Sequence, residues 1–228
     1  MFDNEKVAAI IAAAGKSERM AGIDKIFTIL GNRPVLTRSV YPFECSPFID
    51  RIIILLNQYN FEQGRKLAHD EKWRKVVHIL VGGERRQDTV RVGLAHIGDA
   101  GWVLIHDGAR PLAGLALIED GLNAARDTGA AVPGVAVADT IKVIDGEGFV
   151  ERTTDRKSLV AAQTPQVFRA GIISRAYAWS NEEATDDAML VEKLGVKVKI
   201  FPGSYGNIKI TTPESLATAE LIWRKRGD

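Results

Sequence analysis

Residues 7–20 read VAAIIAAAGKSERM, an apolar run that breaks at Gly15 into a charged segment, with Lys25 a few residues later. A continuous apolar run of this length is typical of a strand that is covered on both faces. Alanine and glycine let backbone N–H groups approach an anion closely, and Arg19 and Lys25 supply positive charge. The stretch therefore predicts a buried strand that opens into a polyphosphate-binding loop. The alternative is a plain βα turn with solvated cations.

Two standard phosphate-binding motifs do not account for this loop. Gly15-Lys16-Ser17 matches the end of a P-loop, but Ile10 stands where that motif needs its first glycine. The dinucleotide fingerprint fails as well, because Ser17 and Met20 occupy positions where it needs glycines. Any phosphate site here must be of another kind.

Further apolar runs without regular polar alternation follow along the chain. They are Ile52–Leu56, Val76–Val81, Trp102–Ile105 and Ala130–Val137. Helical patterns lie between them at Glu84–Ile97 and Gly114–Thr128, and a C-terminal helix is indicated by the capping Thr212 and by Pro213. Alternating β and α elements predict an α/β fold, a doubly wound, mostly parallel sheet of Rossmann-like type.

The composition restricts the class of protein. The chain has 228 residues, and its formal net charge of +1 gives no general field that would attract nucleic acid or a membrane. One cysteine, Cys45, excludes an internal disulfide and a cysteine-built zinc site. The first apolar run is too short for a signal peptide or a membrane span, so we expect a cytoplasmic protein.

Residues 139–158 interrupt the α/β rhythm. Apolar residues flank a turn-forming Asp145-Gly146 pair in a short, imperfect alternation that is typical of a β-hairpin. Such a hairpin has no obvious place in the main sheet, so it would cap the site or reach a second subunit. We therefore expect one domain, residues 1–228, with residues 138–160 as a protruding β-arm.

The sequence His106-Asp107-Gly108-Ala109-Arg110-Pro111 follows directly after a predicted strand. Carboxyl ends of parallel strands face the ligand crevice, which places Asp107 where a ligand of Mg²⁺ would sit. Arg110 lies close enough to meet a phosphate. The alternative is that Asp107 caps the following helix.

A glycine pair, Gly82-Gly83, ends another predicted strand, and Thr89 follows on the next helix. Glycines permit close approach of the backbone to a planar base, and Thr89 offers a hydroxyl. The alternative is a turn, an N-cap and a solvated helix face.

Lys209 lies in the otherwise apolar segment Asn207-Ile208-Lys209-Ile210. A cation is costly in an apolar strand unless an anion binds there, so the segment indicates a further phosphate contact. The alternative is an edge strand with Lys209 pointing to water.

Taken in order, these segments resemble the 2-C-methyl-D-erythritol 4-phosphate cytidylyltransferases over nearly the whole chain. The matching pieces are Ala13-Ala14-Gly15, Arg19-Met20, Asp24-Lys25, Gly82-Gly83-Glu84-Arg85, His106-Asp107-Gly108-Ala109-Arg110-Pro111, Asp139-Thr140-Ile141-Lys142, Thr154-Asp155-Arg156, Gln163-Thr164-Pro165-Gln166, Thr185-Asp186-Asp187 and Asn207-Ile208-Lys209-Ile210-Thr211. The resemblance implies the fold of nucleotide-diphospho-sugar transferases, and a reaction in which CTP and a sugar-alcohol phosphate give a CDP-alcohol and pyrophosphate. In that reaction an acceptor phosphate oxygen attacks the α-phosphorus in line.

The resemblance also implies roles for individual residues. Arg19, Lys25 and Lys209 would be catalytic and hold the triphosphate and its transition state. Contacts to CTP would come from Ala13, Ala14, Gly15, Gly82, Gly83, Glu84 and Thr89. Contacts to the acceptor would come from Asp107, Arg110, Thr140, Arg156, Thr164, Thr185 and Thr211. Asp107 would also position Mg²⁺, and the hairpin would cross into a neighbouring subunit to form a homodimer with shared sites.

Several residues depart from the usual family pattern: Ala12 replaces a proline, Ser17 a glycine, Ile26 a glutamine and Asp187 a glutamate. A rival acceptor is D-ribitol 5-phosphate, which would use the same triphosphate machinery. A wider alternative is a nucleotidyltransferase that joins a sugar 1-phosphate to another base. A non-catalytic nucleotide-binding regulator is a third, although the retained cations argue against it.

Overall fold

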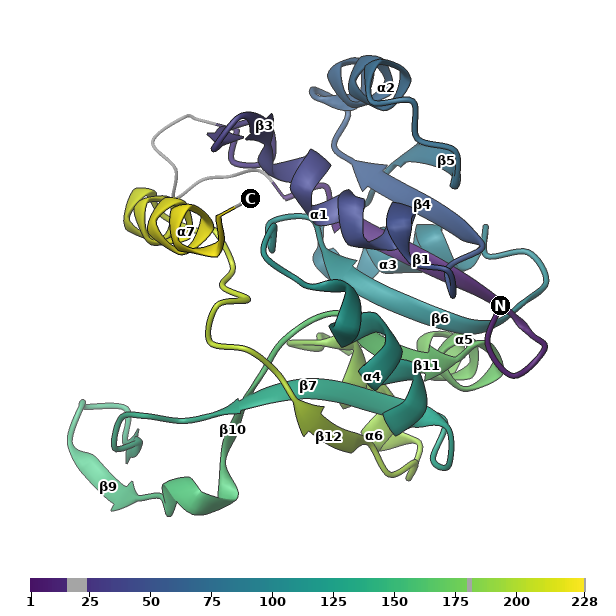
Figure 1. The fold of residues 1–228 in the computed structure, drawn as a ribbon. Coiled ribbons are helices and arrows are strands. Elements are labelled where there is room, and N and C mark those ends of the chain that lie inside the picture. The colour runs from purple at the N-terminus through teal and green to yellow at the C-terminus, as the bar shows by residue number, and fades with distance from the viewer. Residues whose placement is uncertain (16–23, 180–181, 228) are drawn as a thin grey trace.

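Eight strands form a central sheet, and helices cover both of its faces (Figure 1). The structure is a computed structural model, and it describes residues 1–15, 24–179 and 182–227. The strands of the sheet span Lys6–Ala13 (β1), Arg51–Leu56 (β4), Val76–Val81 (β5), Ala100–Asp107 (β6), Ala130–Ala136 (β7), Val160–Ala162 (β10), Gln166–Arg169 (β11) and Lys199–Pro202 (β12). Their order is β10-β7-β11-β6-β1-β4-β5, with β12 beside β7.

The middle of the sheet is parallel. β1 pairs in parallel with both β4 and β6, and β4 pairs in parallel with β5. Each apolar run predicted as a strand coincides with β1, β4, β5, β6 or β7 to within a few residues. The predicted α/β fold with a mostly parallel sheet is therefore confirmed. Because these strands run in the same direction, β1, β5 and β6 end at one edge of the sheet, at Ala13, Val81 and Asp107.

Three strands of the sheet, β10, β11 and β12, are not predicted from the sequence, and each has only three or four residues. β11 lies between β6 and β7 and is antiparallel to both. It has only four residues, and it begins with the buried polar Gln166, so it carries too little of the apolar pattern to be recognised.

The helices divide between the two faces because β1 alternates its side chains. They span Val35–Cys45 (α1), Phe61–Asp70 (α2), Arg86–Leu94 (α3), Leu115–Ala125 (α4), Ala170–Trp179 (α5), Asp187–Lys193 (α6) and Pro213–Arg226 (α7). Ile11 packs into one core with Leu36 of α1 and Ile118 of α4, whereas the neighbouring Ile10 packs into the other with Val90 of α3. Covering both faces in this way is what a doubly wound sheet requires.

The C-terminal helix α7 begins as the sequence predicts. The Thr212 side chain accepts a hydrogen bond from the Ser215 backbone N–H, and Pro213 occupies the first turn. The apolar face of α7 packs through Ala219 on Leu30, which belongs to the short hairpin of Ile29–Leu30 (β2) and Arg33–Pro34 (β3). The helix therefore joins the C-terminal segment to the segment that follows Lys25.

The predicted hairpin residues pair as two antiparallel strands, Lys142–Ile144 (β8) and Val150–Thr153 (β9), and a short 3₁₀ helix follows. Asp145 closes the turn between them, because its side chain accepts hydrogen bonds from the Glu147 and Phe149 backbone N–H groups. The hairpin projects away from the sheet (Figure 1). Its use as a dimerisation arm stays a prediction. In the part of the chain that the structure describes, no helix has the length and apolar character needed to cross a membrane.

Candidate active site

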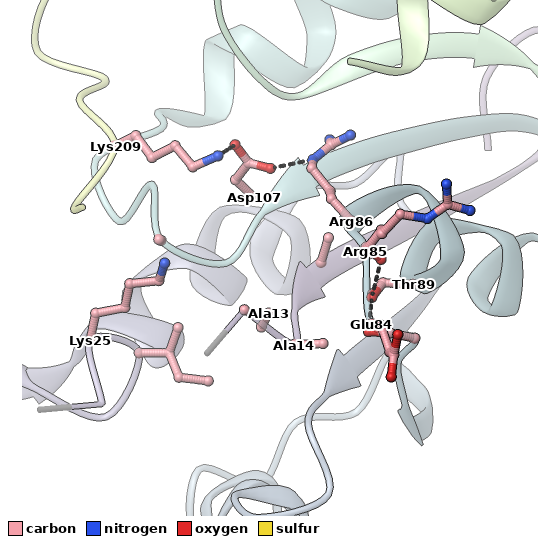
Figure 2. A pocket seen from close by; sticks show the side chains of 14 residues that line it. Ala13, Ala14, Lys25, Glu84, Arg85, Arg86, Thr89, Asp107 and Lys209 are labelled. Atoms are coloured by element: carbon pink, nitrogen blue, oxygen red, sulfur yellow. Dashed lines mark hydrogen bonds and ion pairs between the residues drawn. The ribbon is translucent and has the colours of Figure 1, made fainter. Parts of the chain in front are cut away.

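A pocket lies at the edge of the sheet where β1, β5 and β6 end (Figure 2). Six residues predicted to contact CTP line it together: Ala13, Ala14, Gly15, Gly83, Glu84 and Thr89. The remaining member of that set, Gly82, does not line the pocket. A Cβ atom on Gly82 would come within 2.7 Å of the Ala14 Cβ and 2.8 Å of the Thr89 Oγ1. Gly82 therefore lets the loop after β1 and the helix α3 approach each other.

The wall formed by Gly83 and Thr89 is held by local hydrogen bonds. The Thr89 hydroxyl lies 3.2 Å from both the Gly83 and Arg85 carbonyl oxygens, to which it can donate. Arg85 in turn binds both carboxylate oxygens of Asp88, and these contacts lower the pKa of Asp88 to about 2. The turn after β5 is thus fixed before any ligand binds.

Lysines from distant parts of the chain enter the same pocket. Lys25 and Lys209 both line it, and Figure 2 shows them on the side opposite Glu84 and Thr89. A Cβ atom on Gly15 would lie 3.6 Å from the Lys25 Nζ, so this ammonium approaches the backbone at the end of β1. Arg19, the third predicted catalytic cation, lies outside the described residues, as does Ser17.

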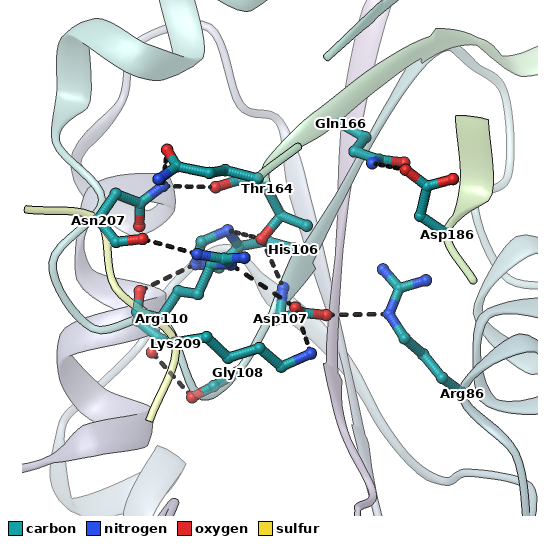
Figure 3. A network of polar contacts seen from close by, with 12 residues as sticks. Arg86, His106, Asp107, Gly108, Arg110, Thr164, Gln166, Asp186, Asn207 and Lys209 are labelled. Atoms are coloured by element: carbon teal, nitrogen blue, oxygen red, sulfur yellow. Dashed lines mark hydrogen bonds and ion pairs between the residues drawn. The ribbon is translucent and has the colours of Figure 1, made fainter. Parts of the chain in front are cut away.

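Asp107, the last residue of β6, is surrounded by cations (Figure 3). Its Oδ1 lies 2.9 Å from the Arg86 Nε, and its Oδ2 lies 2.8 Å from the Lys209 Nζ and 3.7 Å from the Arg110 Nε. Burial alone would raise the pKa of Asp107, but Arg86 and then Lys209 hold that pKa far below its usual range. The carboxylate stays charged and offsets part of the repulsion among the three cations that gather around it. We call these four residues the Asp107 cluster.

Two sequence interpretations of this region are wrong. Asp107 does not cap the following helix, because α4 begins only at Leu115. Lys209 does not lie in a strand, because residues 207–212 belong to none. That segment instead follows the loop after β6, where the Ile210 N–H donates to the Ala109 carbonyl oxygen at 2.8 Å.

The contacts of Asp107 do not fit its predicted role as a Mg²⁺ ligand. Mg²⁺ needs free oxygen ligands, usually one or two carboxylates together with substrate phosphates. Both oxygens of Asp107 already face cations. Among the described residues, no group of three or more histidine, cysteine or acidic side chains is arranged to hold a metal.

A second pocket adjoins the first and shares Arg86, Asp107 and Lys209 with it. Four residues predicted to contact the acceptor line this second pocket: Asp107, Arg110, Thr164 and Thr185. The other three line neither pocket. Thr140 and Arg156 lie in the hairpin region, where Arg156 donates to the Ala138 carbonyl oxygen at 2.8 Å. The Thr211 N–H donates to the Ser215 Oγ near the start of α7.

A buried histidine links the walls of the second pocket. The His106 Nε2 lies 3.1 Å from the Arg110 carbonyl oxygen, which can only accept, so Nε2 carries the hydrogen. Nδ1 then accepts from the Thr164 hydroxyl at 3.0 Å, and that hydroxyl accepts from the Asp107 N–H. Burial lowers the pKa of His106 to about 4, although Asp107 opposes the shift. The neutral ring therefore holds Thr164, Asp107 and Arg110 in register.

Three site residues were not singled out from the sequence: Arg86, His106 and Asn207. Asn207 donates to the Thr164 carbonyl oxygen at 2.9 Å, and its own carbonyl oxygen accepts from Arg110 at 2.7 Å. His106 and Asn207 open two of the motifs quoted above, and Arg86 directly follows a third. Their position in or beside these motifs could have indicated a role in the site. Their contacts could not be predicted, because they join segments that are far apart in the sequence.

Comparisons with known proteins agree with this geometry. A model of the 2-C-methyl-D-erythritol 4-phosphate cytidylyltransferase family matches residues 7–225. A protein of that name from Dehalococcoides mccartyi is 52% identical over 225 residues, which cover 99% of each chain. One from Syntrophotalea carbinolica is 44% identical and covers 97% of this chain and 98% of its own.

Solved structures show the same similarity. The crystal structure of 4-diphosphocytidyl-2C-methyl-D-erythritol synthase from Anaerococcus prevotii superimposes with a TM-score of 0.86 at 30% identity, covering 97% of this chain and all of that one. A 2-C-methyl-D-erythritol 4-phosphate cytidylyltransferase from Thermus thermophilus gives a TM-score of 0.79 at 31% identity, covering 96% of this chain and 99% of its own.

Proposed function

The chain belongs to the 2-C-methyl-D-erythritol 4-phosphate cytidylyltransferase family, and from this premise we propose how its residues carry out the reaction. It is a nucleotidyltransferase of isoprenoid biosynthesis that acts on 2-C-methyl-D-erythritol 4-phosphate. CMP passes from CTP to the phosphate of this acceptor, and pyrophosphate leaves. The observation that carries the proposal is that two pockets share Arg86, Asp107 and Lys209, three of the four residues of the Asp107 cluster.

CTP occupies the first pocket. The cytosine lies against Gly83 and Thr89, where small side chains and backbone leave room for a planar base. The triphosphate lies against the end of β1, near Gly15 and Lys25, where backbone N–H groups and an ammonium can face its oxygens. Arg19 belongs to the same loop by sequence, and we assign it to the triphosphate as well.

The acceptor occupies the second pocket, with its phosphate at the shared boundary. An oxygen of that phosphate forms a bond to the α-phosphorus of CTP, while the bond from the α-phosphorus to the bridging oxygen of the β-phosphate breaks. The electron pair of the broken bond leaves with pyrophosphate. Negative charge grows on the α-phosphate oxygens during this step, and preorganised cations stabilise such charge most strongly. Lys25 and Lys209 line the pocket at this point and fill that role.

The Asp107 cluster aligns the two substrates. Arg110 and Lys209 face the second pocket as well as Asp107, so they can meet the acceptor phosphate without losing their anchor. Holding the reactants in line contributes to the rate independently of charge. A divalent cation such as Mg²⁺ would add positive charge to the triphosphate, and Asp107 does not fit as its ligand because both of its oxygens face cations.

The hairpin completes the acceptor pocket of a second subunit in a homodimer. Ile144, Phe149 and Val150 are apolar and exposed on it, which supports burial against a partner. Thr140 and Arg156 line neither pocket of their own chain. In a dimer these two residues would serve the acceptor bound to the other subunit.

A pyrophosphate-release assay tests the proposal directly. The purified protein is incubated with CTP and Mg²⁺, and either 2-C-methyl-D-erythritol 4-phosphate or D-ribitol 5-phosphate is added. We expect release with the first acceptor, matched by equal formation of a cytidine diphosphate product in the mass spectrum, and far slower release with the second. Faster turnover of ribitol phosphate would contradict the acceptor, and no turnover with either would favour a non-catalytic nucleotide-binding protein.

A further inference from the structure

Arg86 is the residue through which the Asp107 cluster is tied to the protein interior. It lies in the first turn of α3 and lines both pockets. Its Nε binds Asp107, and its NH2 lies 2.7 Å from the Oδ2 of Asp187 at the start of α6. Arg86 therefore connects a carboxylate at the pocket with a second carboxylate behind it (Figure 3 shows the pocket end).

Asp187 is fully buried, so its charge must be balanced by close partners. One oxygen binds Arg86, and the other accepts the hydroxyl of Tyr177, on α5, at 2.5 Å. Burial and then Asp187 raise the pKa of Tyr177 above its ordinary value, which keeps that hydroxyl protonated as a donor. Because Tyr177 and Arg86 each bind one oxygen of Asp187, the carboxylate cannot rotate freely, and it holds the Arg86 guanidinium in one orientation.

The start of α6 is itself anchored to the sheet. Gln166, on β11, donates to the Asp186 carboxylate at 2.8 Å and accepts from the Ala188 N–H at 3.1 Å. Asp186 also caps α6, since its side chain accepts from the Met189 N–H. Asp187 consequently holds Arg86 from a rigid base and not from a surface loop.

We propose that the Tyr177–Asp187 pair is a positioning device for catalysis: it fixes Arg86, which orients Asp107 and, through Asp107, the ammonium of Lys209. The inference rests on the proposed function of Lys209 in the transfer step. The contacts run without a break from α5 through α6 and α3 to β6 and the segment before α7. Asp187 and Tyr177 line neither substrate pocket, and the side-chain contact that leads from them to both pockets is that of Arg86.

The test compares Asp187→Asn and Tyr177→Phe with Val191→Ala. Val191 is a fully buried core residue on the same helix, so its truncation loosens α6 without removing any hydrogen bond of the network. A reacting group displaced by about 1 Å can lose about 100-fold in rate. We expect kcat to fall by about 10-fold to 100-fold in Asp187→Asn and less in Tyr177→Phe, with the KM for CTP little changed. Val191→Ala should keep its kcat within about twofold at a similar loss of melting temperature.

Loss of kcat that tracks melting temperature equally in all three variants would overturn the proposal. Tyr177→Phe removes a single oxygen, so it decides the question if Asp187→Asn does not fold. Crystal structures give a readout that needs no activity: the contact between Arg86 and Asp107 should lengthen beyond hydrogen-bond reach in a network variant. An unchanged contact would count against the device. An active wild type with unaffected variants refutes only this inference, whereas an inactive wild type refutes the proposed function.

Discussion

The role assigned to Lys209 can be tested with the substitution Lys209→Met. Methionine keeps most of the length and apolar stem of the side chain and removes only the ammonium, which lies 2.8 Å from the Asp107 Oδ2. Asp107 keeps two cationic neighbours in the variant, Arg86 at 2.9 Å and Arg110 at 3.7 Å. The perturbation therefore removes one charge from the pocket without leaving a buried carboxylate alone.

The structure allows the effects on stability and on rate to be separated. The Lys209 side chain is 38% exposed, so solvent screens its ion pair and the loss of stability should be about 1 kcal/mol. For a chain of this size that lowers the melting temperature by about 2–4 °C. In the transition state, one preorganised charge contact is worth about 3 kcal/mol, so kcat should fall by about 100-fold.

Initial rates of pyrophosphate release at saturating CTP and acceptor measure kcat, and thermal unfolding followed by circular dichroism measures stability. Lys6→Met is the matched control, because Lys6 makes an ion pair of similar length, 2.7 Å to Asp99, at the other end of the sheet. We expect the control to keep the wild-type kcat. A Lys209→Met enzyme with kcat within about threefold of wild type would refute the role given to this lysine.

Three further predictions follow from the same site. Lys25→Ala should also lower kcat by about 100-fold with the fold intact, and near-wild-type turnover would exclude Lys25 from the transition state. Arg156→Ala should raise the KM for the acceptor, and mixing it with Lys25→Ala chains should restore part of the activity; no recovery despite proven subunit exchange would contradict shared sites. The pKa of His106 is about 4 when folded against an ordinary value of 6.5, so the free energy of unfolding should decrease as pH falls from about 6.5 to about 4, by about 3 kcal/mol in total. Urea titrations should show a flatter pH dependence for His106→Gln, and equal slopes would contradict this.

The parts of the fold that sequence predicts are those governed by local pattern. β1 and its parallel neighbours read as unbroken apolar runs because helices cover them on both faces. The start of α7 is also predictable, because Thr212 caps the helix and Pro213 lies in its first turn, and both effects are local. The antiparallel β11 was missed because four residues between longer strands leave no such pattern.

The residues of the candidate site could be predicted from the sequence, but the contacts among them could not. Residue types and their order indicate Lys25, Asp107 and Lys209 as site residues, and the fold places all three around one pocket. What the carboxylate of Asp107 does depends on Arg86 and Lys209, which approach it from other segments of the chain. The sequence predicts Asp107 as a metal ligand because nothing in it indicates that cations contact both carboxylate oxygens.

The most direct test of the central claim is a crystal structure of the protein with CTP bound. We expect the cytosine against Gly83 and Thr89, and the α-phosphate within about 3 Å of the Lys25 and Lys209 ammonium groups, beside the second pocket. A triphosphate bound away from these two lysines, with the Asp107 cluster left facing solvent, would contradict the account.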